Sequence, residues 1–191
     1  MLNNLEKYDV VLGSNSPRRR ELLADMGVKF RVEAIKGIDE TYPASLPVED
    51  IPVYLSRLKA DGHPLSDGEL LITADTVVVL DETVLGKPVD EADAHRMLRS
   101  LSGRAHRVIS GVCVSTVDRV ESFADTSIVH FAELTDEEID YYIEHYRPLD
   151  KAGAYGIQEW IGNIGISGIN GDFYNVMGLP TRKLYQVLKS F

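Results

Sequence analysis

Apolar positions along the chain follow two spacings, one typical of strands and one typical of helices. Continuous apolar or β-branched runs predict strands at residues 8–13, 30–35 and 70–80, and two more around the turn Asp118-Arg119 within residues 107–132. Apolar residues three and four positions apart predict helices from Pro17 to Gly27, from Ile51 to about Gly62, from Asp90 to Gly103, from Thr135 to Tyr146 and from Pro180 to Phe191. This alternation, with an antiparallel hairpin at 107–132, predicts an α/β fold with a mixed sheet.

Capping residues define several of these helix starts. Ser16 is a suitable N-cap, and Pro17 fits the first helical position, where its missing N–H has no partner to lose. Thr135 and Glu138 form a capping-box pattern. The helix that follows is expected to bury Ile139, Tyr142, Ile143 and Tyr146. The glycine-rich stretch at 153–171 is expected to form short strands and turns around a site.

Composition limits the class of protein. With 191 residues, 44% hydrophobic and 26% charged, the chain suits one large globular domain or two small lobes. Thirty acidic against twenty basic side chains give a net charge of −10, which argues against nucleic-acid binding as the main role. A small anionic substrate stays possible, because a local basic pocket acts over a few ångströms.

Cysteine usage and the chain's first residues bear on the compartment. The single cysteine, Cys113, excludes an intrachain disulfide and lies in an apolar run typical of a core. The segment that begins at Met1 has no basic region followed by an apolar stretch, and no apolar run reaches the roughly 18 residues of a membrane span. We therefore expect a cytoplasmic protein with no membrane contact.

The segment Ser14-Asn15-Ser16-Pro17-Arg18-Arg19-Arg20 has features of an anion site. It joins the first strand to the first helix, so unpaired backbone N–H groups and the helix dipole face whatever lies above the turn. Hydroxyls and forked guanidinium donors suit phosphate oxygens. The alternative is an ordinary helix cap followed by a solvated basic turn.

Asp75 is unusual because it interrupts a β-branched strand. A carboxylate there loses hydration at a cost of several kcal/mol unless it reaches partners or a cleft. One interpretation is a metal-associated general base at an exposed strand end. The alternative is a buried aspartate satisfied by backbone donors or a salt bridge.

Further polar residues indicate a functional site only if the fold brings them close to Asp75. Glu40 lies in an acidic turn, and a hard divalent cation takes oxygen ligands from more than one segment. Lys59 and Lys87 are individually typical of surface lysines, but together with the arginines they would neutralise a triphosphate. Gln158 ends a run of small residues and can both donate and accept, as reading a nucleobase edge requires, although a plain tight turn is the alternative.

Six of these segments, taken in order, resemble the motif series of the Maf family. They are Ser14-x-Ser16-Pro17-Arg18-Arg19, Gly37-Ile38-Asp39-Glu40, Ala74-Asp75-Thr76-Val77, Gly86-Lys87-Pro88, Asp150-Lys151-Ala152-Gly153-Ala154-Tyr155-Gly156-Ile157-Gln158 and Gly178-Leu179-Pro180. The resemblance implies one Maf-like domain over residues 1–191, with an ITPase-like elongated mixed sheet flanked by helices and a deep cleft between two lobes, often in a homodimer. It also implies a nucleoside triphosphate pyrophosphatase that uses a divalent cation such as Mg²⁺ or Mn²⁺.

The resemblance assigns roles residue by residue. Asp75 matches the proton acceptor, and Glu40, Lys59 and Lys87 match polar positions of the family's cleft. From this placement we expect Glu40 and Asp75 to hold the metal. We further expect the phosphates to be held by Ser14, Ser16, Arg19, Lys59 and Lys87. Arg18, Thr76 and Gln158 match the combination of the dTTP/UTP type, whose substrates could include modified pyrimidine nucleotides.

Two other functions and one departure qualify this assignment. A non-catalytic nucleotide-binding regulator of septum formation would need no metal-associated carboxylate, and a house-cleaning enzyme would prefer modified or purine nucleotides. The family usually continues from Gln158 into small residues, whereas Glu159 and Trp160 follow here. A bulky aromatic beside the base pocket would narrow it or offer a stacking face.

Overall fold

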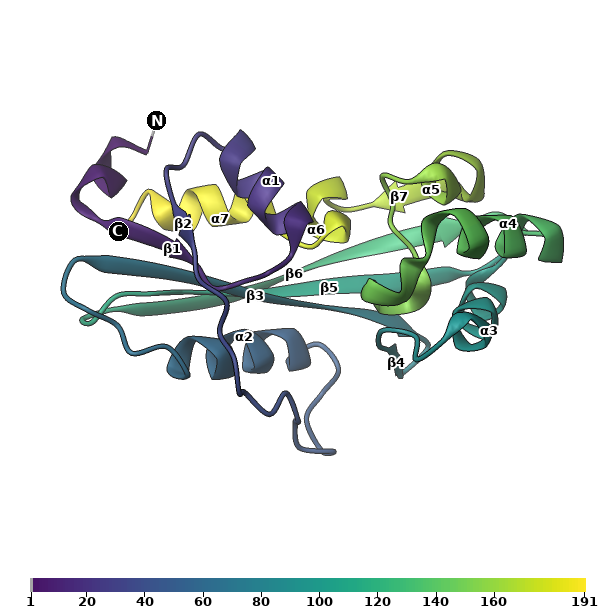
Figure 1. Ribbon diagram of the computed structural model, residues 1–191, viewed down its shortest axis with the longest axis horizontal. Helices are drawn as coiled ribbons and strands as arrows, with labels where there is room; N and C mark the ends of the chain where they lie inside the picture. Colours follow the sequence, from purple (N-terminus) through teal and green to yellow (C-terminus); the bar gives the residue numbers. More distant parts are fainter. Residues whose placement is uncertain (1) are drawn as a thin grey trace. The chain divides into compact units, whose positions relative to one another are not determined.

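The computed structural model describes residues 2–191, so Met1, where the expectation about the leader begins, lies outside the described residues. The chain runs through η1 (Asn3–Lys7), β1 (Asp9–Leu12), α1 (Pro17–Asp25), β2 (Arg31–Val32), α2 (Ile51–Asp61), β3 (Glu69–Leu80), β4 (Thr83–Leu85), α3 (Glu91–Leu101), β5 (Ala105–Ser115), β6 (Val120–Phe131), α4 (Asp136–Tyr146), η2 (Pro148–Asp150), η3 (Ala152–Ala154), α5 (Trp160–Gly165), β7 (Ile166–Asn170), α6 (Phe173–Met177) and α7 (Thr181–Leu188) (Figure 1). Within residues 2–191, no helix has the length and apolar character needed to span a bilayer.

The strands form one seven-stranded mixed sheet. Its order is β2-β1-β3-β5-β6-β7, and β4 pairs with β3 outside this path. β1 is parallel to β2 and β3, whereas β4 runs antiparallel to β3 and β7 antiparallel to β6. β5 and β6 meet in a hairpin, in which the Thr116 N–H donates to the Arg119 carbonyl at 2.8 Å. The predicted α/β class is confirmed, and the deep cleft stays a prediction.

The chain folds into two compact units. The first comprises Met1–Asp75, Ser110–Asp125 and Gly178–Phe191, and the second comprises Thr76–Ile109 and Thr126–Met177. The chain passes from one unit to the other within β3, β5 and β6, and again between α6 and α7. Within β3, the first unit ends at Asp75 and the second begins at Thr76. These are the residues expected to act as the proton acceptor and to select the nucleobase.

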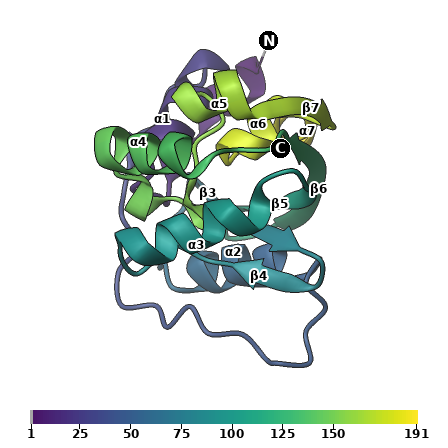
Figure 2. The same ribbon diagram turned by 90° about the vertical axis from the view of Figure 1, so that its right-hand side faces the viewer.

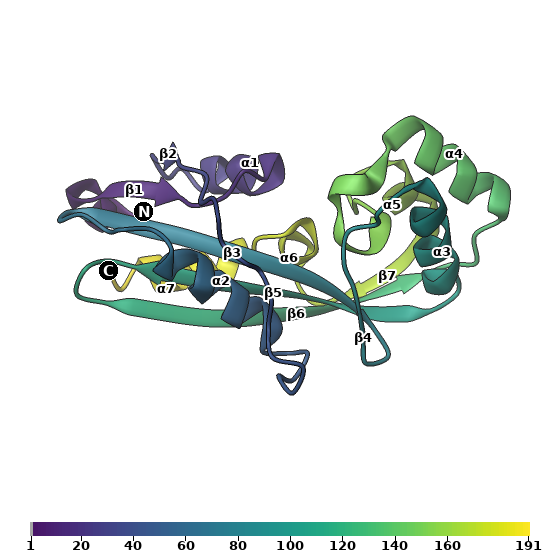
Figure 3. The ribbon, with the colours of Figure 1, turned by 60° about the horizontal axis from the view of Figure 1, so that its bottom comes forward.

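In the first unit, α2 covers one face of the sheet, and α1 and α7 cover the other (Figures 1 and 3). Ala60 of α2 packs with Val11, Leu71 and Cys113, so the prediction that Cys113 is a core residue is confirmed. The backbone of α2 also lies directly against the backbone of β5 at Gly111. A Cβ placed on Gly111 would lie 2.2 Å from the Pro52 carbonyl carbon and 2.3 Å from the Val53 nitrogen.

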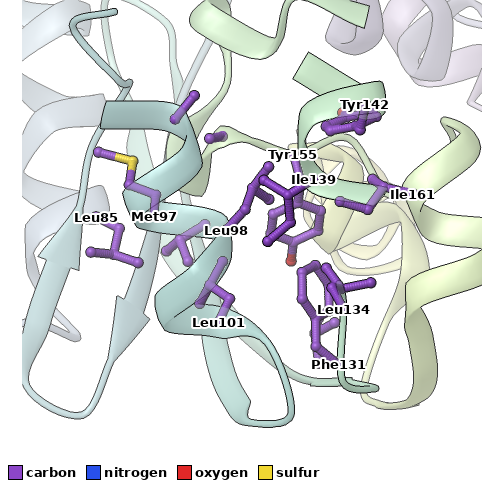
Figure 4. Packing of buried hydrophobic residues seen from close by; sticks show 14 of the residues in the cluster. Leu85, Met97, Leu98, Leu101, Phe131, Leu134, Ile139, Tyr142, Tyr155 and Ile161 are labelled. Atoms are coloured by element: carbon purple, nitrogen blue, oxygen red, sulfur yellow. The ribbon is translucent and has the colours of Figure 1, made fainter. Parts of the chain in front are cut away.

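The second unit has its own apolar core. α3 packs against α4 and η3 (Figure 2). The core contains Leu98 and Leu101 of α3 with Ile139 and Tyr142 of α4, all with 0% of their surface exposed (Figure 4). The capping box at Thr135 is formed as predicted, because its hydroxyl accepts from the Glu138 N–H and the Glu138 carboxylate accepts from the Thr135 N–H.

Three local predictions were wrong. The strand expected at 30–35 is only Arg31–Val32, because it pairs with the last residues of β1 at the sheet edge and both of its side chains are exposed. The stretch at 153–171 contains the helix α5 before β7. Tyr146 is 38% exposed rather than buried, since α4 ends there and its ring stacks on Tyr142 from the outside.

Replacing Gly111 with alanine should destabilise the fold by about 1–3 kcal/mol, because the added methyl group meets the backbone of α2, which has no rotamer to change. Urea unfolding would measure the loss as a lower midpoint. Gly168→Ala in β7 is the matched control, since its new Cβ would meet no atom nearer than 4.0 Å. Equal midpoints for the two variants would contradict the close approach.

Candidate functional site

The turn between β1 and α1 is built from its own hydroxyls. The Ser14 Oγ accepts from the Ser16 N–H at 3.2 Å, and the Ser16 Oγ accepts from the Arg19 N–H at 3.5 Å, as expected of an N-cap. The turn borders a pocket of about 390 Å³, lined by Ser14, Asn15, Ser16, Pro17, Arg20, Glu21, Ala24 and Val32. Ser14 and Ser16 therefore lie where an anion could reach the start of the helix, and Arg20 lines the same pocket.

Arg19 connects this turn to the middle of β3. Its Nε donates to the Gly178 carbonyl at 2.9 Å, and its Nη1 donates to the Ala74 carbonyl at 2.7 Å and to the Ser14 Oγ at 3.4 Å. Burial lowers the pKa of Arg19, and the charge of Asp75 opposes that shift. The guanidinium thus fixes the backbone immediately before Asp75, and its role in phosphate binding stays a prediction.

Asp75 and Thr76 are partly exposed positions in a strand whose residues are otherwise buried from Leu70 to Leu80. The Asp75 side chain is 14% exposed. It lies in the middle of β3 rather than at an exposed strand end, because the apolar run at 77–80 continues the strand beyond it. That part of the prediction was wrong, and the carboxylate reaches a polar environment at mid-strand instead.

Lys59 neutralises this carboxylate. Its Nζ lies 2.7 Å from the Asp75 Oδ1, and the lysine side chain is only 15% exposed. The pairing follows from local geometry. Thr73 and Asp75 share a face of β3, and the Thr73 hydroxyl donates at 2.6 Å to the Ser56 carbonyl in α2. Because Lys59 lies one helical turn after Ser56, its side chain lies next to Asp75. The salt bridge that the sequence left as the alternative for Asp75 is therefore present.

Glu40 converges on the same ammonium group. Its Oε2 lies 2.9 Å from the Lys59 Nζ, and its side chain is 54% exposed. Three segments far apart in sequence thus place two carboxylates around one cation. The described residues, 2–191, contain no group of three or more His, Cys, Asp or Glu side chains that could hold a metal ion. Two carboxylates nevertheless fit Mg²⁺, which usually binds through one or two of them and completes its shell with water and phosphate oxygens.

The remaining predicted residues divide between the units. Arg18 is half-buried in the first turn of α1. In the second unit, Thr76 is half-buried in β3, and Lys87 is exposed after β4, beside the Gly86 carbonyl that accepts from the Gly153 N–H at 3.0 Å. Gln158 is exposed in a turn before α5. Their assembly with the first unit's residues around one nucleotide stays a prediction.

A second charged cluster, around Lys151, was not predicted from the sequence. The Lys151 side chain is 9% exposed, and its Nζ lies 2.7 Å from Asp150 and 3.2 Å from Glu159. The other oxygen of Glu159 accepts from the Tyr142 hydroxyl. The departure from small residues after Gln158 was the available signal, but the pattern placed Tyr142 only in the core.

Comparison with solved structures identifies the class of fold. The chain is similar to a HAM1 protein from Coxiella burnetii, with a TM-score of 0.52 and 14% sequence identity over 96% of this chain and 100% of that chain. At this identity the likeness concerns the fold alone. It agrees with the predicted ITPase-like arrangement of a mixed sheet flanked by helices.

Sequence comparison identifies the family. A model described as Maf-like protein matches residues 9–191, and the chain belongs to the Maf family. A dTTP/UTP pyrophosphatase of Porphyromonas gingivalis is 56% identical over 195 residues, covering 100% of this chain and 98% of the relative. Proteins with the same name from Phocaeicola vulgatus and Bacteroides thetaiotaomicron are 56% and 54% identical, each over 99% of both chains. The resemblance drawn from the motifs is confirmed.

Replacing Lys59 with methionine should strengthen the binding of Mn²⁺ in the absence of nucleotide by about tenfold, because the ammonium competes with a cation for Asp75 and Glu40. Titration calorimetry would measure the change. The control is Lys87→Met, which removes an exposed ammonium group in the second unit and should leave Mn²⁺ affinity unaltered. Weaker Mn²⁺ binding by the Lys59 variant would contradict this account of the two carboxylates.

Proposed function

We propose that this Maf family protein hydrolyses dTTP and UTP, and modified pyrimidine nucleotides of the same shape, to the monophosphate and pyrophosphate. The name shared by the relatives that are 54–56% identical over nearly the whole chain supports the reaction and the substrates. The observation that carries the proposal is the Asp75 carboxylate at the midpoint of a buried strand, held 2.7 Å from the Lys59 ammonium group, which Glu40 also contacts. The cytoplasm, where nucleotides are abundant, is the proposed compartment.

Asp75 is the proposed proton acceptor. Hydrolysis between the α- and β-phosphates needs a water molecule in line with the leaving pyrophosphate, and a carboxylate near that water takes up its proton. The strand fixes the Asp75 backbone, and Arg19 holds the carbonyl of Ala74 next to it. The base is therefore oriented before substrate arrives.

Cationic groups of the chain would receive the polyphosphate. Lys59 shares its ammonium between two carboxylates, and phosphate oxygens would replace one of these partners when a nucleotide binds. A divalent cation, held by Glu40 and Asp75 together with the phosphates, would reduce the negative charge at the reacting phosphorus. Ser14, Ser16, Arg19 and Lys87 are proposed to contact the remaining phosphate oxygens, and Arg18, Thr76 and Gln158 are proposed to select the base.

A panel of nucleoside triphosphates, assayed for pyrophosphate with Mg²⁺, with Mn²⁺ and with a chelator, tests the proposal. We expect pyrophosphate from dTTP and UTP at rates well above those for purine nucleotides, and none with the chelator. Orthophosphate as the first product, or tight nucleotide binding without turnover, would contradict it. The second result would favour a non-catalytic regulator, and a purine preference would favour the house-cleaning alternative.

Asp75→Asn should lower kcat by about 10²–10⁴-fold while leaving the fold intact, because the amide keeps the shape of the side chain but cannot take up a proton. Steady-state pyrophosphate release would measure it. Asp67→Asn, in the exposed loop before β3, is the matched control and should retain wild-type kcat. Full turnover by the Asp75 variant would remove this carboxylate from the role of base.

Gln158→Glu should lower kcat/KM for dTTP and UTP by about 10–100-fold, because a carboxylate cannot donate a hydrogen bond and leaves a base acceptor unpaired. Relative rates across the nucleotide panel would measure the change in selectivity. Gln186→Glu, the same substitution at an exposed position of α7, is the control. Identical relative rates in all three proteins would exclude Gln158 from base recognition.

A further inference from the structure

Gln158 lies at the tip of a four-residue turn in the second unit. The turn runs from Gly156 to Glu159 and is closed by the Glu159 N–H, which donates to the Gly156 carbonyl at 3.0 Å. Gly156 and Ile157 are buried, whereas Gln158 is exposed. The tip is thus open to a ligand, and the direction in which it presents its amide depends on how the two ends of the turn are held.

One hydroxyl from α4 holds both ends. The Gly156 N–H donates to the Tyr142 Oη at 3.0 Å, and the Tyr142 hydroxyl in turn donates to the Glu159 carboxylate. The Tyr142 ring is 0% exposed in the core of this unit (Figure 4), so the hydroxyl has a fixed position. Burial and the neighbouring Glu159 raise the pKa of Tyr142 far above its ordinary value, and the hydroxyl therefore stays a donor.

Lys151 completes the arrangement from the other side. Its Nζ lies 3.2 Å from the Glu159 Oε1, so each oxygen of this carboxylate has its own donor. The two side chains also pack closely against Gly156, where an added Cβ would lie 2.9 Å from the Glu159 Cδ and 3.1 Å from the Lys151 Cε and would displace both. The turn is therefore clamped by three side chains, Tyr142, Lys151 and Glu159, which we call the turn clamp.

We propose that the turn clamp positions Gln158 for base recognition, so that Tyr142, Lys151 and Glu159 determine nucleotide selectivity without touching the nucleotide. This inference rests on the proposed function. An amide discriminates between bases only if its donor and acceptor are held at fixed angles, which needs a rigid support behind the recognising side chain.

The first test removes only the shared hydroxyl. Tyr142→Phe should raise KM for dTTP by about tenfold and reduce the preference for dTTP over dGTP, with kcat changed less than about twofold, because the turn loses its support while the reacting groups stay in place. Tyr155→Phe is the matched control. It also removes a buried tyrosine hydroxyl from this unit, one that lies 2.7 Å from the His106 Nε2, but it should leave KM and selectivity unchanged.

A double-mutant cycle separates positioning from general stability. If the Tyr142 hydroxyl acts through Gln158, Tyr142→Phe should have no further effect on selectivity in a Gln158→Ala background. Additive losses in the double variant would overturn the proposal. Glu159→Gln, which keeps an acceptor for the Tyr142 hydroxyl, should retain more selectivity than Glu159→Ala, and equal losses would count against the clamp.

Thermal unfolding of each variant provides the check on folding. A lower melting temperature with KM and selectivity unmoved would assign Tyr142 a structural role only and overturn the inference. Failure of the proposed function gives a different result, since the wild-type protein itself would then release no pyrophosphate from dTTP or UTP. The two failures are therefore distinguishable in one set of assays.

Discussion

The ion pair between Lys59 and Asp75 is the interaction on which the proposed chemistry depends. A carboxylate at the midpoint of a buried strand is unstable without a charged partner, and removing one partner of such a pair leaves an uncompensated charge. Lys59 meets this need from the last turn of α2 and extends the contact to Glu40. Because α2 is fixed to β3 through Thr73 and Ser56, the pair is held by the fold rather than by flexible side chains.

The same arrangement keeps Asp75 ready for proton transfer. Arg19 binds the carbonyls of Ala74 and Gly178, so the backbone before the carboxylate is held by a charge-assisted donor. In the second unit, the Tyr142 hydroxyl binds both ends of the turn that carries Gln158. At Asp75 the structure thus fixes the chain before the functional residue, whereas at Gln158 it fixes the chain on both sides and leaves the residue itself exposed.

Much of the local structure could be predicted because it depends on nearby residues. The N-cap at Ser16, the capping box at Thr135 and the long central strand carrying Asp75 all follow from short-range chemistry and periodicity, and all are formed. The predictions failed where contacts with other segments of the chain decide the local structure. Residues 30–35 have a strand-like pattern, but a strand needs a partner, and β1 offers pairing for only two residues. Likewise, the high glycine content of residues 153–171 predicts strands and turns, whereas the structure forms the helix α5 there.

The sequence by itself determined the order of the long helices and strands, the family and the unusual position of Asp75, because composition, periodicity and motif spacing are properties of neighbouring residues. Only the tertiary structure decided which distant side chains meet. It selected Lys59 as the partner of Asp75, brought Glu40 to the same ammonium group, directed Arg19 to backbone carbonyls and joined Tyr142 and Lys151 to Glu159. These contacts depend on how the helices pack on the sheet and on other segments of the chain. A buried charge needs a partner, and only the tertiary packing determines which distant residue that partner is.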